Sequence, residues 1–238
     1  IKMSDKSSML EQLGLLRNLL LRALGVTVFI FACLAFFQDS IYLSISEPLI
    51  RFLPDNSSMI ATEVTSPFLT PLKLTFYIAI FVAIPYLMFE LWKFVSPGLF
   101  KTEKIYTISL TGLSTVLFYL GTFFAFFVVF PLIFSFFINS APEGVAVMTD
   151  ISSYLNFVIK LLVAFGLAFQ MPIVIFTLVK SEITSIEALS NARPYVIIGC
   201  FIFGMLLTPP DIISQTLLAV PTWTLFELGL LGARLIKT

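Results

Sequence analysis

The sequence contains no histidine, and only 12% of its 238 residues are charged. Without histidine, the chain can form neither a histidine-ligated metal site nor a catalytic triad that needs a histidine base. Its two cysteines, Cys33 and Cys200, fall in separate apolar segments, where thiols usually act as small buried hydrophobes. The formal net charge is zero, so charge indicates no partner such as nucleic acid. We expect no metal and no cofactor.

Apolar residues dominate the chain instead. They make up 58% of it, and the mean hydropathy of +1.02 is far above that of a soluble domain. No polar stretch is long enough to build a separate soluble domain. The composition therefore predicts an all-α integral membrane protein, in which residues 1–238 form a single transmembrane bundle domain within the lipid bilayer.

Six apolar segments are candidates for membrane-spanning helices, at residues 19–37, 70–95, 105–138, 154–179, 194–208 and 215–236. Six spans place both termini on the same side of the membrane. Of the 14 Lys and Arg residues, only Arg51, Lys73 and Lys160 lie outside or toward the opposite face, which leaves eleven on the side of the termini. This imbalance predicts that both termini are cytoplasmic.

The six predicted spans differ in length and in their prolines. The third exceeds the ~30 Å hydrocarbon core, and Pro131 is expected to kink it. Pro194 and the Pro209-Pro210 pair bound the fifth, which leaves about 14 residues, or roughly 20 Å of helix. We therefore expect the last two helices to be short and the bilayer beside them to be thinned. Similar breaks are expected in the second, fourth and sixth spans, at Pro85, Pro172 and Pro221.

The first outer loop, residues 38–68, is the longest connection between spans. Asp39 or Ser40 is expected to cap a short helix that runs from Ile41 to about Phe52, followed by an extended return at residues 59–62. Together these pieces predict a periplasmic cap over the bundle. Elsewhere, Thr149 and Asp150 are expected to cap the fourth span, and residues 180–193 are expected to form an ordinary solvated connection.

Charge is densest between spans around residues 94–104, where Glu103 and the lysines at 93, 101 and 104 surround a Pro-Gly turn. In one interpretation, Glu103 only complements the dipole at the start of the third span. In the other, its carboxylate binds a planar guanidinium through two hydrogen bonds. The sequence alone leaves both interpretations open.

Polar side chains within the spans are costly in lipid unless they have partners. Glu90 has Lys93 one turn away, so we expect a structural pair. Glu227 has Arg234 two turns later on the same face, and this pair could also neutralise itself. Gln170 directly precedes a Met-Pro pair near mid-membrane, where its amide could bond the carbonyls that proline leaves open, in either a structural or a functional role.

A third polar group flanks the Pro209-Pro210 pair, at the junction of the fifth and sixth spans. Asp211 could simply cap the sixth helix. Alternatively, polar side chains at a thinned edge would suit the docking of another transmembrane helix. The members of this group are Met205, Thr208, Asp211 and Gln215.

Six strings of the sequence resemble the TatC component of the twin-arginine protein translocase. They occur in order along essentially the whole chain, and together they are far more specific than one short motif. The strings are residues 59–68 (MIATEVTSPF), 73–76 (KLTF), 92–94 (WKF), 141–145 (APEGV), 193–196 (RPYV) and 204–211 (GMLLTPPD).

The resemblance implies a receptor and not an enzyme. TatC proteins of the bacterial inner membrane bind the twin-arginine signal peptides of folded cargo at their cytoplasmic face. They assemble with the single-span proteins TatA and TatB, form homo-oligomers in the receptor complex, and transport is driven by the proton-motive force. Carried over to this sequence, the signal-binding positions are Phe94 and Glu103 in the loop and Arg17 in the N-terminal segment. The outer-cap position is Pro48, the partner-docking positions are Met205, Thr208 and Gln215, and Asp211 is a recurrent position.

The sequence departs from the family pattern at two places. Where the family usually has His-Leu-x-Glu-Leu-Arg, residues 12–17 read Gln-Leu-Gly-Leu-Leu-Arg, so Leu15 replaces a signal-binding carboxylate. Glu11, one turn earlier on the same helical face, could partly substitute for it. A frequent glutamate of the fourth span is Gln170 here, which retains hydrogen bonding without charge.

Two other function classes were weighed against this resemblance. A secondary transporter or channel would use Gln170, Lys160 and Glu227 as a polar pathway. An intramembrane protease is less favoured, because the sequence has no histidine, no Gly-x-Ser-x-Gly motif and no paired intramembrane aspartates.

Overall fold

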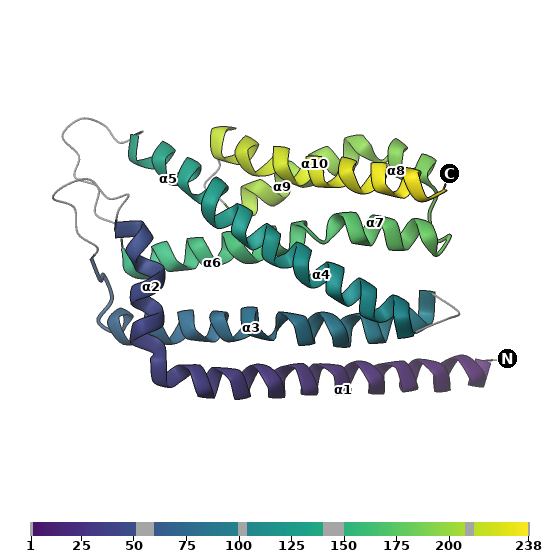
Figure 1. The fold of residues 1–238 in the computed structure, drawn as a ribbon, viewed down its shortest axis with the longest axis horizontal. Helices are drawn as coiled ribbons and strands as arrows, with labels where there is room; N and C mark the ends of the chain where they lie inside the picture. Colours follow the sequence, from purple (N-terminus) through teal and green to yellow (C-terminus); the bar gives the residue numbers. More distant parts are fainter. Residues whose placement is uncertain (1, 51–59, 100–103, 140–149, 208–211, 238) are drawn as a thin grey trace. The chain divides into compact units, whose positions relative to one another are not determined.

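The computed structural model describes residues 2–50, 60–99, 104–139, 150–207 and 212–237 (Figure 1). These parts of the chain are helical and contain no β-strand, only an isolated bridge between Ile60 and Asp150, so the predicted all-α class is confirmed. The elements are α1 (Lys2–Leu34), η1 (Ala35–Phe37), α2 (Gln38–Ile50), α3 (Ser66–Leu99), α4 (Lys104–Phe124), η2 (Ala125–Val129), α5 (Phe130–Asn139), α6 (Ile151–Ala168), α7 (Met171–Lys180), α8 (Ile186–Asn191), α9 (Arg193–Leu207) and α10 (Ile212–Lys237).

Five helical segments are long and apolar enough to cross a membrane: Leu13–Ile45, Ser66–Val95, Thr107–Phe137, Ile151–Lys180 and Ile212–Leu235. The predicted fifth span corresponds to α9, a shorter apolar helix of 15 residues. The six predicted spans are therefore found at their expected places. The last two are the shortest, with 24 residues in the Ile212–Leu235 segment.

Proline breaks two of these segments, ahead of Pro131 and Pro172, as predicted. The breaks predicted at Pro85 and Pro221 are wrong, because α3 and α10 remain helical through these prolines. Pro131 has no N–H and its ring would crowd the carbonyl four residues earlier, and the helix ahead of it widens into the π-helical turn η2, where the Phe130 N–H donates to the Ala125 carbonyl. Ahead of Pro172, the chain makes a turn at Phe169 and Gln170 that divides one span into α6 and α7.

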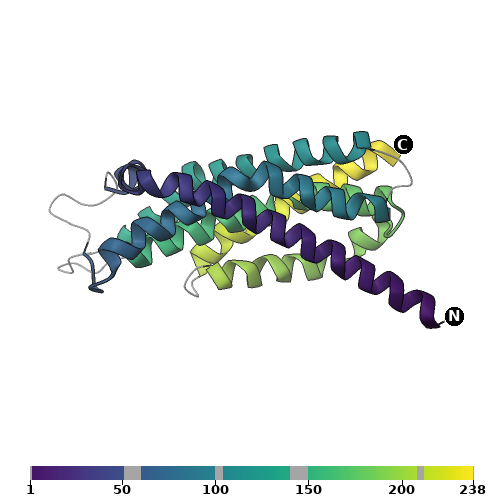
Figure 2. The same cartoon turned by 90° about the horizontal axis from the view of Figure 1, so that it is seen from below.

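The chain forms two compact units, which are described separately. The first unit comprises residues 1–42 and 71–115 and contains α1, most of α3 and the first part of α4. The rings of Phe31 and Phe76 meet edge to face at 5.7 Å, and the Trp92 Nε1–H donates to the Ser114 Oγ at 2.7 Å. These contacts hold α1 and α4 against α3, and α1 and α3 lie side by side in Figures 1 and 2.

The second unit comprises residues 43–70 and 116–238. Its α7 and α10 pack around a core in which Ile175, Phe226 and Ala233 are buried, with Val196 of α9 against them. Stacked and edge-to-face rings of Phe130, Phe134 and Tyr154 join α5 to α6. Of the two cysteines, Cys200 is buried as expected, whereas Cys33 of the first unit is exposed.

Two predicted pieces of the first outer loop, a short helix and an extended return, can be compared with the structure on either side of residues 51–59, which lie outside the described part. The predicted short helix is α2, in which Pro48 lies, although its side chain is outside the described part. The expected capping by Asp39 or Ser40 is wrong, because the chain stays helical through η1 and both residues lie within α2. The extended return is present at Ile60, whose carbonyl accepts from the Ile151 N–H at 3.0 Å.

Of the predictions for the cap of the fourth span and for residues 180–193, the first is confirmed and the second is wrong. Asp150 caps α6, as predicted, by accepting a hydrogen bond from the Ser153 N–H at 2.9 Å. Residues 180–193, in contrast, are more than a solvated connection. They contain the short helix α8, which Ser185 caps, and they border a cavity.

Candidate functional site

The paired helices α1 and α3 run antiparallel in the first unit. Arg22 contacts Glu90, and Phe31, farther along α1, contacts Phe76, which is earlier on α3. The N-terminal part of α1 and the C-terminal part of α3 therefore lie at the same end of this pair. That end carries the N-terminal segment and the residues that lead into the loop before α4.

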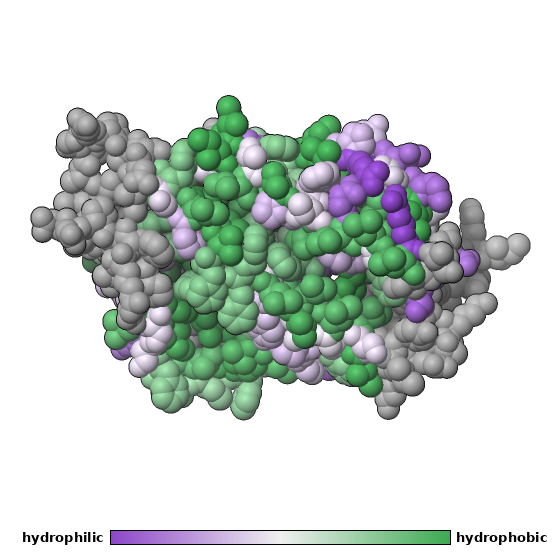
Figure 3. Space-filling view, turned by 45° about the horizontal axis from the view of Figure 1, so that its top comes forward, coloured by the Kyte–Doolittle hydropathy of each residue, from purple (hydrophilic) through white to green (hydrophobic). Residues whose placement is uncertain are grey.

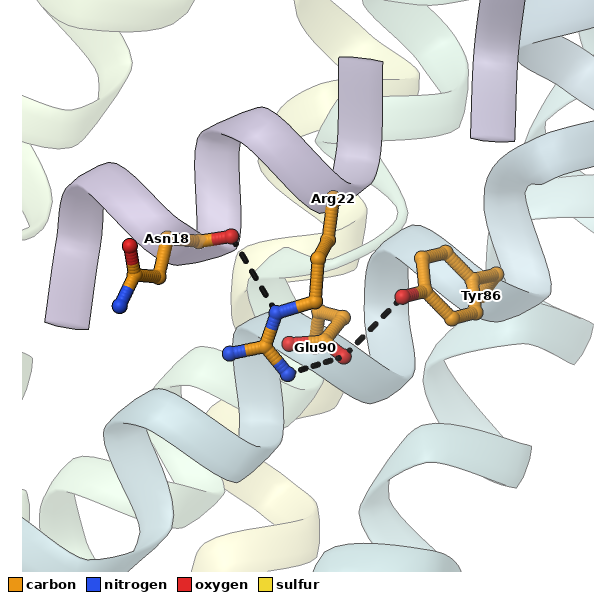
Figure 4. Close-up of polar contacts among 4 residues, drawn as sticks. All are labelled: Asn18, Arg22, Tyr86 and Glu90. Carbon is orange, nitrogen blue, oxygen red and sulfur yellow. Dashed lines mark hydrogen bonds and ion pairs between the residues drawn. The ribbon is translucent and has the colours of Figure 1, made fainter. Parts of the chain in front are cut away.

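A buried carboxylate joins the two helices (Figure 4). The Arg22 Nη1 lies 3.5 Å from the Glu90 Oε1, and the Tyr86 hydroxyl donates to the same oxygen at 3.2 Å. The Arg22 Nε also donates to the Asn18 carbonyl at 3.3 Å. Burial of a charge in a membrane helix is costly unless the charge is paired, so this cluster stabilises the approach of α1 to α3.

The predicted pairing of Glu90 with Lys93 is not the one that the structure contains. The partners of Glu90 are Arg22 and Tyr86, and the Lys93 Nζ instead lies 5.9 Å from the centroid of the Phe89 ring. Glu90 and Lys93 are three residues apart on α3, but a partner on the neighbouring helix competes with this local spacing.

Two predicted signal-binding residues lie at the shared end of α1 and α3. Arg17 lies five residues before Arg22, and Phe94 lies four residues after Glu90, distances of about 7 Å and 6 Å along the helix axes. Both side chains are exposed. The end therefore presents a guanidinium on one helix and an aromatic ring on the other.

The N-terminal part of α1 is apolar around Arg17. Leu13, Leu15 and Leu16 are all exposed, and Leu15 is 53% exposed. A surface of this kind suits an apolar peptide segment, while Leu15 offers no acceptor for a guanidinium. Among the other predicted binding residues, Glu11 lies in α1 with its side chain outside the described part, and Glu103 lies outside the described residues, between the end of α3 at Leu99 and the start of α4 at Lys104.

A second polar cluster lies in the second unit, between α9 and α10. Arg193 binds Glu227 through two hydrogen bonds, from Nε to Oε1 at 2.7 Å and from Nη2 to Oε2 at 2.9 Å. Its Nη1 donates to the Ser190 Oγ at 2.8 Å. Arg193 is therefore a hydrogen-bonded partner of Glu227 that sequence spacing did not indicate. The predicted partner Arg234 also acts on the Glu227 carboxylate through its charge.

The predicted docking group is centred on the contact of α9 with α10. The Gln215 Nε2 donates to the Phe201 carbonyl at 2.8 Å, and a Cβ on Gly204 would lie 3.1 Å from the Gln215 carbonyl oxygen. Met205, the next residue on α9, is 48% exposed. Gln215 thus fastens the two helices beside an exposed methionine, while Thr208 and Asp211 lie outside the described residues.

Gln170 makes the hydrogen bond that its structural interpretation predicted, to a carbonyl left open ahead of Pro172. Its backbone N–H donates to the Leu167 carbonyl in the tight turn ahead of Pro172, and its side-chain Nε2 lies 3.4 Å from the Gly166 carbonyl. The side chain thereby bonds a carbonyl that the turn diverts from its usual helical partner. Gln170 and Glu227, two of the three residues of the alternative polar pathway, both have hydrogen-bond partners within the protein.

Sequence reasoning missed Arg22, Tyr86 and Ser190 as members of these clusters. One signal was available: Arg22 and Glu90 are opposite charges inside two apolar segments, and such charges usually pair across helices. The sequence offers several alternative pairs, however, and only the packing of α1 on α3 selects this one.

Comparisons with known proteins agree with this arrangement. The family model of the Sec-independent protein translocase protein TatC matches residues 11–221. The TatC of Azotobacter chroococcum mcd 1 is 51% identical over 221 residues, covering 92% of this chain and 87% of the relative. The TatC of Escherichia coli strain K12 is 47% identical over 234 residues, covering 98% and 91% of the two chains.

A solved structure is similar as well. The crystal structure of the twin-arginine translocase receptor TatC matches with a TM-score of 0.85 and 29% sequence identity. The match covers 95% of this chain and all of that one. The match therefore extends over residues of both compact units.

Proposed function

Since the chain belongs to the TatC family of Sec-independent protein translocase proteins, we propose that it is the receptor core of a twin-arginine translocase. The observation that carries the proposal is the match of the family over residues 11–221, which includes both helices of the α1–α3 pair. In this role the chain binds signal peptides and catalyses no reaction. The chain is a multi-pass membrane protein, and we place both of its termini in the cytoplasm.

The shared end of α1 and α3 is the proposed signal-peptide site. Glu103 accepts one guanidinium of the twin-arginine motif through two hydrogen bonds, and the exposed ring of Phe94 packs beside it. Glu11 takes part of the role of the carboxylate that Leu15 lacks. Arg17, on the same helix as Glu11, is the remaining residue of the proposed site.

Partner binding is proposed at the contact of α9 with α10. Met205, Thr208 and Gln215 would receive the transmembrane helix of a single-span TatA or TatB protein. The support is geometric: Gln215 already holds the two helices together, and Met205 next to it is exposed. We further propose that several copies of the chain assemble in the receptor complex and that the proton-motive force drives transport.

The signal-peptide site is tested by crosslinking a photoreactive twin-arginine signal peptide to the full chain in membrane vesicles. Glu103→Ala should abolish the crosslinks, because no second carboxylate is available at position 15. Glu63→Ala, which changes an exposed carboxylate of the first outer loop, is the matched control and should crosslink like the unaltered chain. Unchanged crosslinking by Glu103→Ala would remove the proposed site, and Leu15→Glu should strengthen crosslinking.

The docking site is tested by disulfide crosslinking in a background where Cys33 and Cys200 are replaced by alanine. Met205→Cys should form a disulfide with a cysteine in the transmembrane helix of a TatA or TatB partner. Leu113→Cys, on the equally exposed surface of α4, should not. Equal yields at the two positions would show random collision in the membrane and would contradict the docking site.

A further inference from the structure

A cavity of about 570 Å³ lies in the second unit, where α7 ends and the chain turns into α8. Its volume is within the range of small-molecule sites. No function assigned above uses it. The lining residues are Phe176, Val179, Lys180, Glu182, Ile183, Thr184, Ser185 and Ala233.

The cavity lies at the level where two membrane helices leave the apolar layer. Lys180 is the last residue of the Ile151–Lys180 segment, and Ala233 lies two residues before the end of the Ile212–Leu235 segment. Figure 3 shows hydrophilic atoms gathered at the end of the molecule where α8 lies, next to a largely hydrophobic surface. A cavity at this boundary is at the depth expected for lipid head groups.

The lining combines two opposite charges with an apolar floor. Lys180 and Glu182 supply one positive and one negative group, and Thr184 and Ser185 supply hydroxyls. The Lys180 Nζ lies 5.4 Å from the centroid of the Phe176 ring, which places its ammonium over the aromatic part of the cavity. The lining is therefore zwitterionic, and it favours a ligand with both a negative and a positive group.

The backbone at Glu182 is a second, independent feature. Its φ of 59° lies in the left-handed region, and it is the only described non-glycine residue with a positive φ. The Glu182 N–H donates to the Val179 carbonyl and the Ile183 N–H to the Leu178 carbonyl, which together form a Schellman motif at the end of α7. Glycine is the residue usually found at this position, so the glutamate strains the backbone where its carboxylate borders the cavity.

We propose that this cavity binds the phosphoethanolamine head group of a membrane phospholipid. The phosphate is bound by Lys180 with the hydroxyls of Thr184 and Ser185, and the primary ammonium donates hydrogen bonds to the Glu182 carboxylate. The apolar floor accommodates the glycerol and the start of the acyl chains. A choline head group has no N–H to donate to Glu182, and a glycerol head group has no positive charge, so both should bind more weakly.

Native mass spectrometry of the full chain in detergent tests this assignment. Dioleoyl lipids with ethanolamine, choline or glycerol head groups, which share the same acyl chains, are added in equal amounts. We expect the ethanolamine lipid to bind about fivefold more tightly than the other two, the size of one interfacial charge contact. Lys180→Gln and Glu182→Gln should each remove this preference.

Lys93→Gln is the matched control, because Lys93 also lies over a phenylalanine one turn earlier but borders no described cavity. It should leave the preference unchanged. Glu182→Gly separates binding from folding: it relieves the left-handed strain, so it should raise the thermal stability of the chain while it removes the preference. Loss of stability together with loss of binding would mean that Glu182 acts only in folding, and would overturn the proposal.

The remaining outcomes also decide the assignment. A preference for the glycerol lipid that depends on Lys180 but not on Glu182 would identify an anionic-lipid site and overturn the zwitterionic one. Soluble O-phosphoethanolamine and inorganic phosphate are added as competitors. Displacement of the lipid by O-phosphoethanolamine at equal concentration would identify a site for the free compound instead of the lipid, and weak competition supports the lipid.

Discussion

In the first compact unit the described glycines lie in open space, whereas in the second unit four glycines lie where a neighbouring helix leaves little room for a side chain. A Cβ on Gly14, Gly25 or Gly112 would meet nothing within 4 Å. A Cβ on Gly121 would lie 2.5 Å from the Phe165 carbonyl oxygen, and one on Gly166 would lie 2.6 Å from the Phe118 ring. Gly204 and Gly229 are similarly crowded, although Gly199 and Gly232 of the second unit are not.

The ion pairs of the two units also differ, and the pair in the second unit is the more closely bound. In the second unit, Arg193 and Glu227 share two hydrogen bonds of 2.7 and 2.9 Å. In the first unit, Arg22 reaches Glu90 through one contact of 3.5 Å, and its side chain is half exposed. A bidentate pair fixes both partners, while a single long contact lets the arginine move.

This contrast indicates how the two units divide their roles. Small residues let helix backbones approach closely in membranes, so the second unit is a tightly packed scaffold. The first unit includes most of the Leu13–Ile45 segment, in which only 6% of the residues of its most apolar window are buried, and it carries the proposed signal-peptide site. Segments with few buried contacts open at low free-energy cost, which suits a surface that must adapt to many signal peptides.

The strongest test of the difference in packing between the two units is to replace one glycine in each unit by alanine. Gly121→Ala should destabilise the protein by about 2 kcal/mol, because its Cβ would collide with the backbone carbonyl of Phe165, which cannot rotate away. Gly112→Ala, on the same helix but in the first unit, should stabilise it by up to about 1 kcal/mol through helix propensity. Thermal unfolding in detergent measures both. Equal effects of the two substitutions would remove the distinction between the units.

Double-mutant cycles on the two ion pairs sharpen the comparison. Arg193→Gln, Glu227→Gln and the double variant should give a coupling free energy of about 2 kcal/mol, because truncating one partner leaves a partly buried charge alone. The corresponding cycle on Arg22 and Glu90 should give about 1 kcal/mol or less, since the contact is long and the arginine is exposed. The measured quantity is again the free energy of unfolding. A coupling free energy that is larger for Arg22 and Glu90 than for Arg193 and Glu227 would contradict the inference that the first unit is the less rigid of the two.

The sequence predicted those features that depend on local composition. Apolar length located all six spans, and proline chemistry located the breaks ahead of Pro131 and Pro172, although it also predicted breaks at Pro85 and Pro221 that the helices do not have. The cap at Asp150 followed from the same local rules. Such features depend on neighbours a few residues away, and the sequence displays those neighbours directly.

The ion pairs show what local reasoning could not supply. Arg22 and Glu90 are 68 residues apart, and Arg193 and Glu227 are 34 apart. Spacing along one helix favoured Lys93 as the partner of Glu90, whereas the partner in the fold is Arg22. For Glu227, spacing indicated the charge of Arg234, and the fold adds Arg193 as a hydrogen-bonded partner. The resemblance to the family identified candidate positions such as Phe94 and Met205, but the reason that Phe94 lies at the same end as Arg17 is the contact of Arg22 with Glu90. The cavity beside α8 had no sequence signal, because its lining comes from α7, the following turn and α10.

The smallest predicted effect concerns the hydrogen bonds that the Asp150 carboxylate accepts in the second unit, which depend on its negative charge. The Asp150 Oδ1 accepts from the Thr62 N–H at 3.2 Å and from the Thr62 hydroxyl at 2.9 Å, while Oδ2 accepts from the Ser153 N–H. Hydrogen bonds to the carboxylate, above all from the Ser153 N–H, lower the pKa of Asp150 from 3.8 to about 2. The hydrogen bonds from Thr62 join the chain before α3 to the start of α6.

Because the pKa is lowered in the folded protein, the contribution of Asp150 to stability is complete above about pH 4 and is lost as the pH falls through about 2. Asp150→Asn keeps a capping side chain without the charge, so its melting temperature should fall less than that of the unaltered chain between pH 4 and pH 2. The difference between the two melting curves isolates this carboxylate from the other acidic groups that titrate in the same range. If the two melting temperatures fell equally with pH, the hydrogen bonds between Thr62 and position 150 would not need the negative charge of the carboxylate. The packing of the second unit would then not depend on charge at this point.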